Sequence, residues 1–283
     1  MGRHGAVNFE TRGSLLRERP AALLVHGGHG SWRHWEANLD DLDSDLDLLV
    51  PDLPGFGESC DLPPGAGLDD QAETLDQAID SALAGHLPHI VVGFSFGTIV
   101  ATALLERWQR AGLRLPTLVL VNPPLGREVS DEVLAIQARA ADLARVNGLA
   151  AAIELTLREI MLSDSTRVTP ELIELGVLQV KQTRFKSRPI SRSVDLRERL
   201  ARLSAPRHVL LGERDPHQRS RLAARVTQYR SMFGDNNVKV LPGAHWLQRD
   251  CPQAFAQAMR DILAALGASQ GSSDTHSFGE FVQ

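Results

Sequence analysis

The sequence predicts an α/β fold in which a mostly parallel central sheet has helices on both faces and carries an inserted helical cap. Two observations support this prediction. Short apolar runs that end at turn residues alternate with stretches in which apolar residues recur three and four positions apart, which is typical of strand–helix–strand units with right-handed crossovers. Residues 125–204, in contrast, show helical periodicity alone, which indicates an insertion of helices.

The apolar runs are expected to form strands buried on both faces, because each is too short for a helix and is bounded by turn residues. They are Ala21–His26, Leu46–Val50, His89–Phe94, Thr117–Val121, Arg207–Leu211 and Val238–Leu241. Val7–Leu16, with Arg12 and Gly13 at a turn, is expected to add a short hairpin at the sheet edge.

Helices are expected between and after these strands, where apolar residues form one stripe. Those of the core are Asp69–Ala84, Thr98–Arg110, Arg219–Met232 and Pro252–Leu266, and those of the cap are Leu134–Val146, Ala150–Met161 and Pro170–Gln182. The predicted core therefore comprises residues 1–124 and 205–266, and the cap residues 125–204. Residues 267–283 are rich in Gly and Ser without periodicity and are expected to form a flexible tail.

The charge balance disfavours nucleic acid and membrane surfaces as partners. Among 283 residues, 30 Lys and Arg stand against 35 Asp and Glu, which gives a formal net charge of -5 and a pI near 6.1. Such a chain has no strongly basic surface for phosphate groups. Aromatic residues make up only 5% of it, too few for base-stacking platforms. We therefore expect a small-molecule substrate.

The cysteine content predicts a reducing environment. Cys60 and Cys251 lie far apart in no metal-ligand or redox spacing, which disfavours a disulfide framework and a zinc ribbon. No stretch approaches the roughly 20 apolar residues of a membrane span, and the first residues lack the apolar segment of an export signal. We expect a cytoplasmic protein, and a homo-oligomer is compatible with the sequence.

A G-x-S-x-G motif, Gly93-Phe94-Ser95-Phe96-Gly97, lies directly between a predicted buried strand and a predicted helix. A sharp strand-to-helix turn forces its middle residue into strained backbone geometry and crowds its neighbours, so glycine is needed on both sides. Ser95 would then stand exposed above the sheet at a helix N-terminus, where a developing negative charge is stabilised. The motif predicts that Ser95 is a nucleophile.

A serine hydroxyl needs a base and a carboxylate that orients that base. Asp215 follows the strand Arg207–Leu211, and His245 follows the strand Val238–Leu241. Both residues lie beyond the carboxyl end of a late strand, where ligand sites gather in open α/β sheets. Ser, then Asp, then His is also the chain order that this architecture uses. We predict that these residues complete a triad, with Glu213 as a weaker alternative to Asp215.

The backbone amides of Gly28 and Phe96 are predicted to receive an oxyanion. Gly28 lies in a glycine-rich segment after an early strand, where the chain can turn its N–H groups toward a ligand. The same segment holds His26, His29 and His34, but no Cys, acid or further His nearby completes a metal-ligand pattern. We expect neither a metal nor another cofactor.

The segments HGGHGSWRHW, DLPGFGES, GFSFG, GERD and GAHW together resemble the α/β-hydrolase superfamily, in register over nearly the whole chain. The resemblance implies a serine hydrolase. His245 followed by Trp246 is similar to the His-Trp pair of hydrolases that cleave carbon–carbon bonds in meta-cleavage products of aromatic degradation. Those enzymes carry a cap arginine that binds the substrate, and a rough alignment places Gly176 at its position.

Four residues are the candidates for substrate binding: Trp246, Phe94, Arg184 and Arg188. The apolar cap and Phe94 indicate a largely apolar pocket, and the two arginines could pair with a substrate carboxylate. Three functions follow, in descending order of support. They are hydrolysis of a carboxylic ester or related acyl compound, carbon–carbon bond hydrolysis, and ligand sensing with slow turnover.

Overall fold

A seven-stranded sheet forms the centre of the protein. The computed structural model describes residues 6–15, 19–124 and 129–271. In spatial order the strands are β1 (Phe9–Arg12), β3 (Asp47–Pro51), β2 (Ala21–Val25), β4 (Ile90–Phe94), β5 (Thr117–Val121), β6 (Arg207–Gly212) and β7 (Val238–Leu241). β1 runs antiparallel to β3, and the other neighbours are parallel. The predicted fold class is confirmed.

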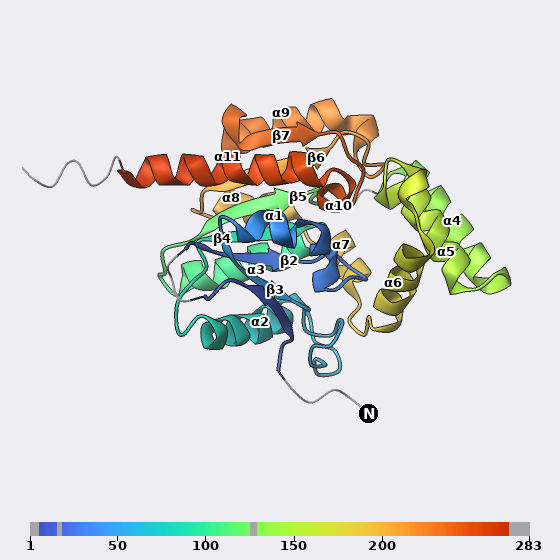
Figure 1. Ribbon diagram of the computed structural model, residues 1–283, viewed down its shortest axis with the longest axis horizontal. Coiled ribbons are helices and arrows are strands. Elements are labelled where there is room, and N and C mark those ends of the chain that lie inside the picture. The colour runs from blue at the N-terminus through green and yellow to red at the C-terminus, as the bar shows by residue number, and fades with distance from the viewer. Residues whose placement is uncertain (1–5, 16–18, 125–128, 272–283) are drawn as a thin grey trace, which may run out of the picture.

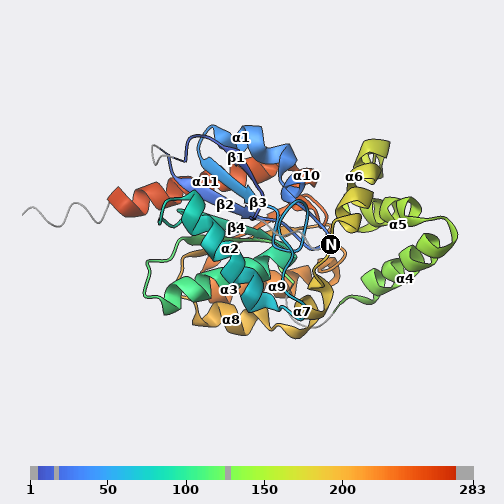
Figure 2. The ribbon, with the colours of Figure 1, turned by 90° about the horizontal axis from the view of Figure 1, so that it is seen from below.

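Helices cover both faces of the sheet (Figure 2). On one face lie α2 (Leu68–Ala82), α3 (Phe96–Arg110), α8 (Leu196–Arg202) and α9 (Leu222–Phe233), and on the other α1 (Leu39–Asp43), α10 (Leu247–Asp250) and α11 (Pro252–Gly271). Because side chains alternate along a strand, Leu23 and Val25 of β2 belong to the first apolar layer and Ala22 and Leu24 to the second. All four are fully buried, which explains the continuous apolar runs in the sequence.

Between β5 and β6 the chain forms a helical arm (Figure 1). The arm contains α4 (Asp131–Val146), α5 (Leu149–Thr156), a π-helical turn (Leu157–Met161), a 3-10 turn (Ser165–Arg167) and α6 (Pro170–Lys181). After α7 (Ser187–Ser193) the chain returns to the core. α8, which falls within the range expected for the cap, instead buries Leu196 and Leu200 in the apolar layer that includes α3.

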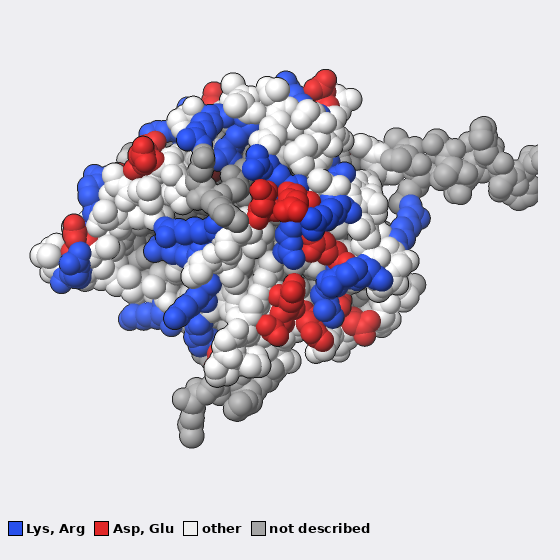
Figure 3. Space-filling model, turned by 180° about the vertical axis from the view of Figure 1, so that it is seen from behind, with Lys and Arg blue, Asp and Glu red and all other residues white. Residues whose placement is uncertain are grey.

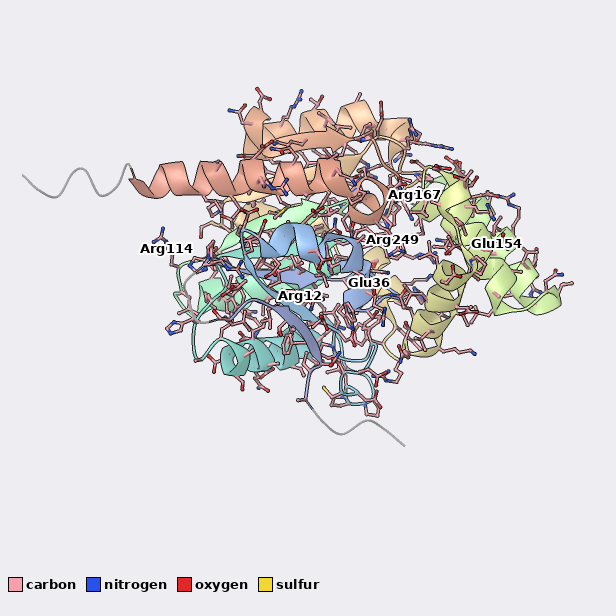
Figure 4. The ribbon with its side chains drawn as sticks, in the orientation of Figure 1. Arg12, Glu36, Arg114, Glu154, Arg167 and Arg249 are labelled. Atoms are coloured by element: carbon pink, nitrogen blue, oxygen red, sulfur yellow. The ribbon has the colours of Figure 1, made fainter. Side chains whose placement is uncertain are left out.

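The arm is held against α10 by Arg167. Its guanidinium donates to the Arg249 carbonyl at 2.8 Å and lies 3.4 Å from the Asp250 carboxylate. Figure 4 shows Arg167 and Arg249 side by side where the arm meets the core. The Asp250 carboxylate also accepts from the amides of Ser163, in the arm, and Ala244, at 2.9 and 2.7 Å.

The structure corrects two expectations at the ends of the chain. The predicted hairpin over Val7–Leu16 is wrong for its described part, because β1 pairs with β3 in the register Phe9 to Pro51. The chain turns away after β1 at Gly13, whose φ is +78°. The predicted tail from residue 267 also starts too early, since α11 continues to Gly271. Residues 272–283 lie outside the described part of the chain.

Candidate active site

Ser95 occupies a strained turn between β4 and α3. Its φ of 50° and ψ of -118° lie in a region that a residue with a side chain rarely adopts, as the motif predicted. A Cβ on Gly93 would lie 2.6 Å from the Gly97 carbonyl oxygen, and one on Gly97 would lie 2.4 Å from the Val25 carbonyl oxygen. Only glycine fits at both positions, so the crowding of β2 and β4 against the start of α3 explains the motif.

Ser95 is linked by a hydrogen bond to His245, which in turn is hydrogen-bonded to Asp215. His245 Nε2 lies 3.0 Å from Ser95 Oγ, and His245 Nδ1 lies 2.9 Å from Asp215 Oδ2. A carboxylate only accepts, so Nδ1 carries the ring proton and Nε2 is free to accept from the serine hydroxyl. The loops after β6 and β7 thus bring Asp215 and His245 to the end of β4, whereas Glu213 is exposed.

Asp215 is held as a carboxylate although it is only 1% exposed. Burial raises its pKa, but the charge and hydrogen bond of His245 outweigh this effect, so the pKa of Asp215 lies below its usual value. The backbone amide of His217 donates to its second oxygen at 2.9 Å. The imidazole of His217 packs on that of His245, with ring centroids 4.5 Å apart. Burial, aided by the charge of His245, lowers the pKa of His217 to about 4.

A cavity of about 530 Å³ opens above Ser95. Its walls come from the sheet end on one side and from α4, α5 and α6 on the other, where Ala140, Ile153 and Leu172 contribute apolar surface. Gly28 and Phe96, the predicted oxyanion donors, both line this cavity beside Ser95. A Cβ on Gly28 would lie 3.6 Å from the Cβ of Phe96, so the two backbone segments approach each other at the same side of the cavity.

Asn122, at the end of β5, organises the loops that carry Asp215 and His245. Its side-chain amide donates to the carbonyls of Ala244 and His245 at 3.0 and 2.8 Å. Its oxygen accepts from the amide of Gly212 at 2.7 Å and from the side chain of Gln218 at 2.6 Å. Asn122 was not among the predicted site residues, although its place directly after a strand and before two prolines was a signal.

The loop of His245 is also bonded to the arm. The amides of His245 and Trp246 donate to the carbonyls of Ile160 and Met161 at 3.2 and 2.9 Å. These carbonyls belong to the π-helical turn that ends α5. The helical insertion therefore contributes both the cavity wall and part of the support for the histidine.

Two of the three histidines of the glycine-rich segment, His26 and His34, have partners within the protein. His26 Nε2 accepts from the Leu53 amide at 2.9 Å, and His34 Nδ1 accepts from the Gly27 amide at 3.2 Å. Burial lowers the pKa of both rings. Trp246 is 2% exposed and donates from Nε1 to the His34 carbonyl at 2.8 Å. Although Trp246 lines the cavity, its polar atom is already bound within the protein.

The four predicted substrate-binding residues are placed differently. Phe94 and Trp246 line the cavity but are almost completely buried, with Phe94 packed on His245 at a centroid distance of 5.3 Å. Arg188 lines the cavity. The assignment of Arg184 is wrong, because it lies outside the cavity lining and its guanidinium binds Asp61 and the carbonyls of Gly57 and Ser59.

One group of side chains in the described part of the chain could hold a metal ion. The ligand atoms of Asp215, His217 and His245 lie within 4.8 Å of one another. Both nitrogens of His245 already face hydrogen-bond partners, however. A metal ion at this place would have to displace those hydrogen bonds. The three side chains are therefore better suited to hydrogen bonding with one another and with Ser95 than to holding a metal ion.

Comparison with known proteins assigns the family. The profile of the Alpha/beta hydrolase family matches residues 22–258. The chain belongs to this family. Within residues 6–15, 19–124 and 129–271, the chain has no helix with the length and apolar character to cross a membrane.

Relatives and solved structures agree with this membership. The chain is 26% identical over 271 residues to the biotin biosynthesis bifunctional protein BioHC of Cellvibrio japonicus, and the match covers 89% of this chain and 49% of that protein. An AB hydrolase superfamily protein of Gibberella zeae is 37% identical over 86 residues, and this match covers 30% of each chain. The chain thus spans about half the length of the first relative, and its match to the second covers less than a third of either protein.

Two solved structures have the same fold. A thermophilic esterase from Thermogutta terrifontis is 24% identical, with 92% of this chain and 93% of that chain covered and a TM-score of 0.69. The enol-lactonase from Burkholderia xenovorans is 16% identical, with 91% and 96% covered and a TM-score of 0.70. At these identities the likeness concerns the fold alone.

Proposed function

We propose that the protein is a serine hydrolase that cleaves a small, largely apolar carboxylic ester through an acyl-enzyme. The observation that carries this proposal is the unbroken chain of hydrogen bonds from Asp215 through His245 to Ser95, which ends in an apolar cavity. The names of the structural neighbours, which include several esterases, support an ester as the substrate class. The low cysteine content is the support for a cytoplasmic location.

In the proposed reaction Ser95 Oγ attacks the ester carbonyl and its proton passes to His245 Nε2. Asp215 keeps the other ring proton on Nδ1 and stabilises the imidazolium. The carbonyl oxygen becomes negative and is received by the amides of Gly28 and Phe96. The tetrahedral intermediate collapses, the carbon–oxygen bond to the alcohol breaks, and His245 protonates the leaving alkoxide.

The acyl-enzyme is then hydrolysed by the reverse use of the same groups. Water gives a proton to His245 Nε2 as its oxygen attacks the acyl carbon, and the carboxylic acid leaves as Ser95 regains its proton. A neutral His217 packed on His245 suits this cycle, because a second positive charge there would oppose formation of the imidazolium.

Carbon–carbon bond hydrolysis ranks second among the functions. The His-Trp pair favours it, but Trp246 presents little surface to the cavity and its Nε1 is bound to His34. Ligand sensing with slow turnover ranks third, since function depends on the site rather than on the fold.

A fluorophosphonate probe tests the proposal directly. We expect one adduct, located on Ser95 by mass spectrometry, and loss of both labelling and p-nitrophenyl pentanoate turnover in Ser95→Ala. Ser231→Ala, exposed on α9 away from the cavity lining, is the matched control and should label fully. Turnover retained by Ser95→Ala refutes the proposal.

The same probe separates the three functions. Rapid labelling of Ser95 with faster turnover of a dienol ketone than of any ester favours carbon–carbon bond hydrolysis. Labelling of Ser95 with negligible turnover of both substrate classes favours a sensor.

A further inference from the structure

Helix α7 presents a polar strip to a cavity that is otherwise largely apolar. Ser187, Arg188, Ser191 and Arg192 all line the cavity that contains Ser95. Positions three and four apart lie on one side of a helix, so Arg188 and Arg192 are neighbours on the same side. On the face opposite to that of Figure 1, Lys and Arg side chains gather where the arm meets the core (Figure 3).

These two arginines differ from most others in having no acidic partner. Arg184 pairs with Asp61, and Arg219 with Glu132. Across residues 6–15, 19–124 and 129–271, neither Arg188 nor Arg192 has a carboxylate within 4.0 Å or a hydrogen-bond acceptor. Partial burial lowers the pKa of Arg188, and the charge of Arg192 lowers it further. Two cations therefore face the cavity together, and no carboxylate of the described residues pairs with either.

Ser187 adds a hydroxyl group to the strip. It is only 3% exposed, yet within the described chain its Oγ has no hydrogen-bond partner. A Cβ on Gly28 would lie 2.8 Å from this oxygen, so the hydroxyl is directed at the glycine-rich loop beside Ser95. Because Ser187 lines the cavity, this hydroxyl can donate a hydrogen bond to a ligand oxygen there.

The strip lies on the same side of the cavity as that loop. The charge of Arg188 contributes, after burial, to the lowered pKa of His29, the residue next to Gly28. Arg188, Gly28 and Ser95 also line the same cavity. A planar guanidinium can donate two parallel hydrogen bonds to a carboxylate. Arg188 and Arg192 each offer such a group to a small anion in the cavity.

We propose that Ser187, Arg188 and Arg192 form an anion subsite and that the substrate is the monoester of a dicarboxylic acid, with its free carboxylate on this strip. This inference rests on the proposed ester hydrolysis at Ser95 for the bond that is cleaved. The apolar wall from α4, α5 and α6 then accommodates the carbon chain and the alcohol.

A pair of matched esters provides the kinetic test. The p-nitrophenyl monoester of glutaric acid and p-nitrophenyl pentanoate have the same acyl length and differ in the terminal carboxylate. We expect the native enzyme to prefer the glutarate ester in kcat/KM. In Arg188→Gln and in Arg192→Gln the ratio of the two kcat/KM values should fall by about 10- to 100-fold, the range for one hydrogen bond to a charged group. The change should lie chiefly in KM.

Arg202→Gln is the matched control. Arg202 lies on α8, pairs with Glu198 and does not line the cavity. Its substitution removes the same charge from the protein and should leave the ratio unchanged. An equal fall in Arg202→Gln would mean that net charge rather than a subsite attracts the anion, and would overturn the proposal.

A binding measurement that needs no turnover separates this proposal from the function on which it rests. Titration calorimetry of glutarate into Ser95→Ala should give a Kd that rises by about 10- to 100-fold when Arg188→Gln is added. If neither ester is hydrolysed but glutarate binds in this manner, ester hydrolysis is wrong and the subsite stands. If both esters are hydrolysed with a ratio that the arginine variants do not change, the subsite is wrong. Tighter binding of a phosphonate of equal length would overturn the choice of a carboxylate.

Discussion

Replacement of Asn122 by alanine should lower the free energy of unfolding and also reduce the activity of the protein. The side chain is 2% exposed and makes hydrogen bonds to four partner groups, in β6, the loop after it and the loop of His245. A buried hydrogen bond contributes about 1 kcal/mol net, so four suggest a loss of about 4 kcal/mol. The φ of 43° at this position, which asparagine tolerates better than alanine, adds roughly 1 kcal/mol.

Urea unfolding and p-nitrophenyl pentanoate turnover measure the two effects. Asn147→Ala is the control, because Asn147 is exposed at the end of α4 and its hydrogen bond to Leu143 comes from the backbone. Asn122→Asp sharpens the test, since a second carboxylate oxygen would face the carbonyls of Ala244 and His245 and should destabilise the protein more at pH 8 than at pH 5. If Asn122→Ala changes the free energy of unfolding by less than about 1 kcal/mol, Asn122 does not hold these loops together.

Three further predictions concern the same site. Asp215→Asn should lower kcat by about 10⁴-fold, as the corresponding change does in a serine protease, whereas Glu213→Gln should have little effect; the reverse result would reassign the acid. Gly97→Ala should destabilise the protein by about 1 to 3 kcal/mol in urea unfolding, because its Cβ would lie 2.4 Å from the Val25 carbonyl; unchanged stability would show that the backbone can move. His217 has a folded pKa of about 4, below its ordinary value. Its contribution to the free energy of unfolding is therefore fully present above pH 6.5 and is lost as the pH falls toward 4. His217→Phe should therefore flatten the fall in stability over this window, which amounts to about 3 kcal/mol, and an unchanged pH profile from urea unfolding would contradict this.

The strands were predictable because their signal is local. Thr117–Val121 and Val238–Leu241 were predicted with the bounds that the structure gives. Thr117–Val121 is buried throughout, as expected for an apolar strand in a sheet covered on both faces. The expected burial on both faces is wrong for Val238–Leu241, which lies at the sheet edge and leaves Val240 42% exposed. The partner of a strand is not local, which is why the predicted hairpin over Val7–Leu16 was wrong: β1 pairs with β3 across about forty residues of chain.

The amino-acid sequence by itself determined the turn at Ser95. Gly93 and Gly97 are required by contacts within the two elements that they join and by the adjacent β2, and this requirement is written in five consecutive residues. The α/β fold likewise followed from periodicity along the chain, because the side-chain repeats of strands and helices differ.

Only the tertiary structure decided which nearby polar residues face the cavity. Arg184 and Arg188 are similar in sequence context, but Asp61 and two carbonyls of the loop after β3 bind Arg184, while Arg188 is left to the cavity. Asn122 acquires its role because the ends of β5, β6 and β7 meet there. The direction and the partner of each side chain depend on residues 90 or more positions away, and a pattern of neighbours in sequence carries no information about such contacts.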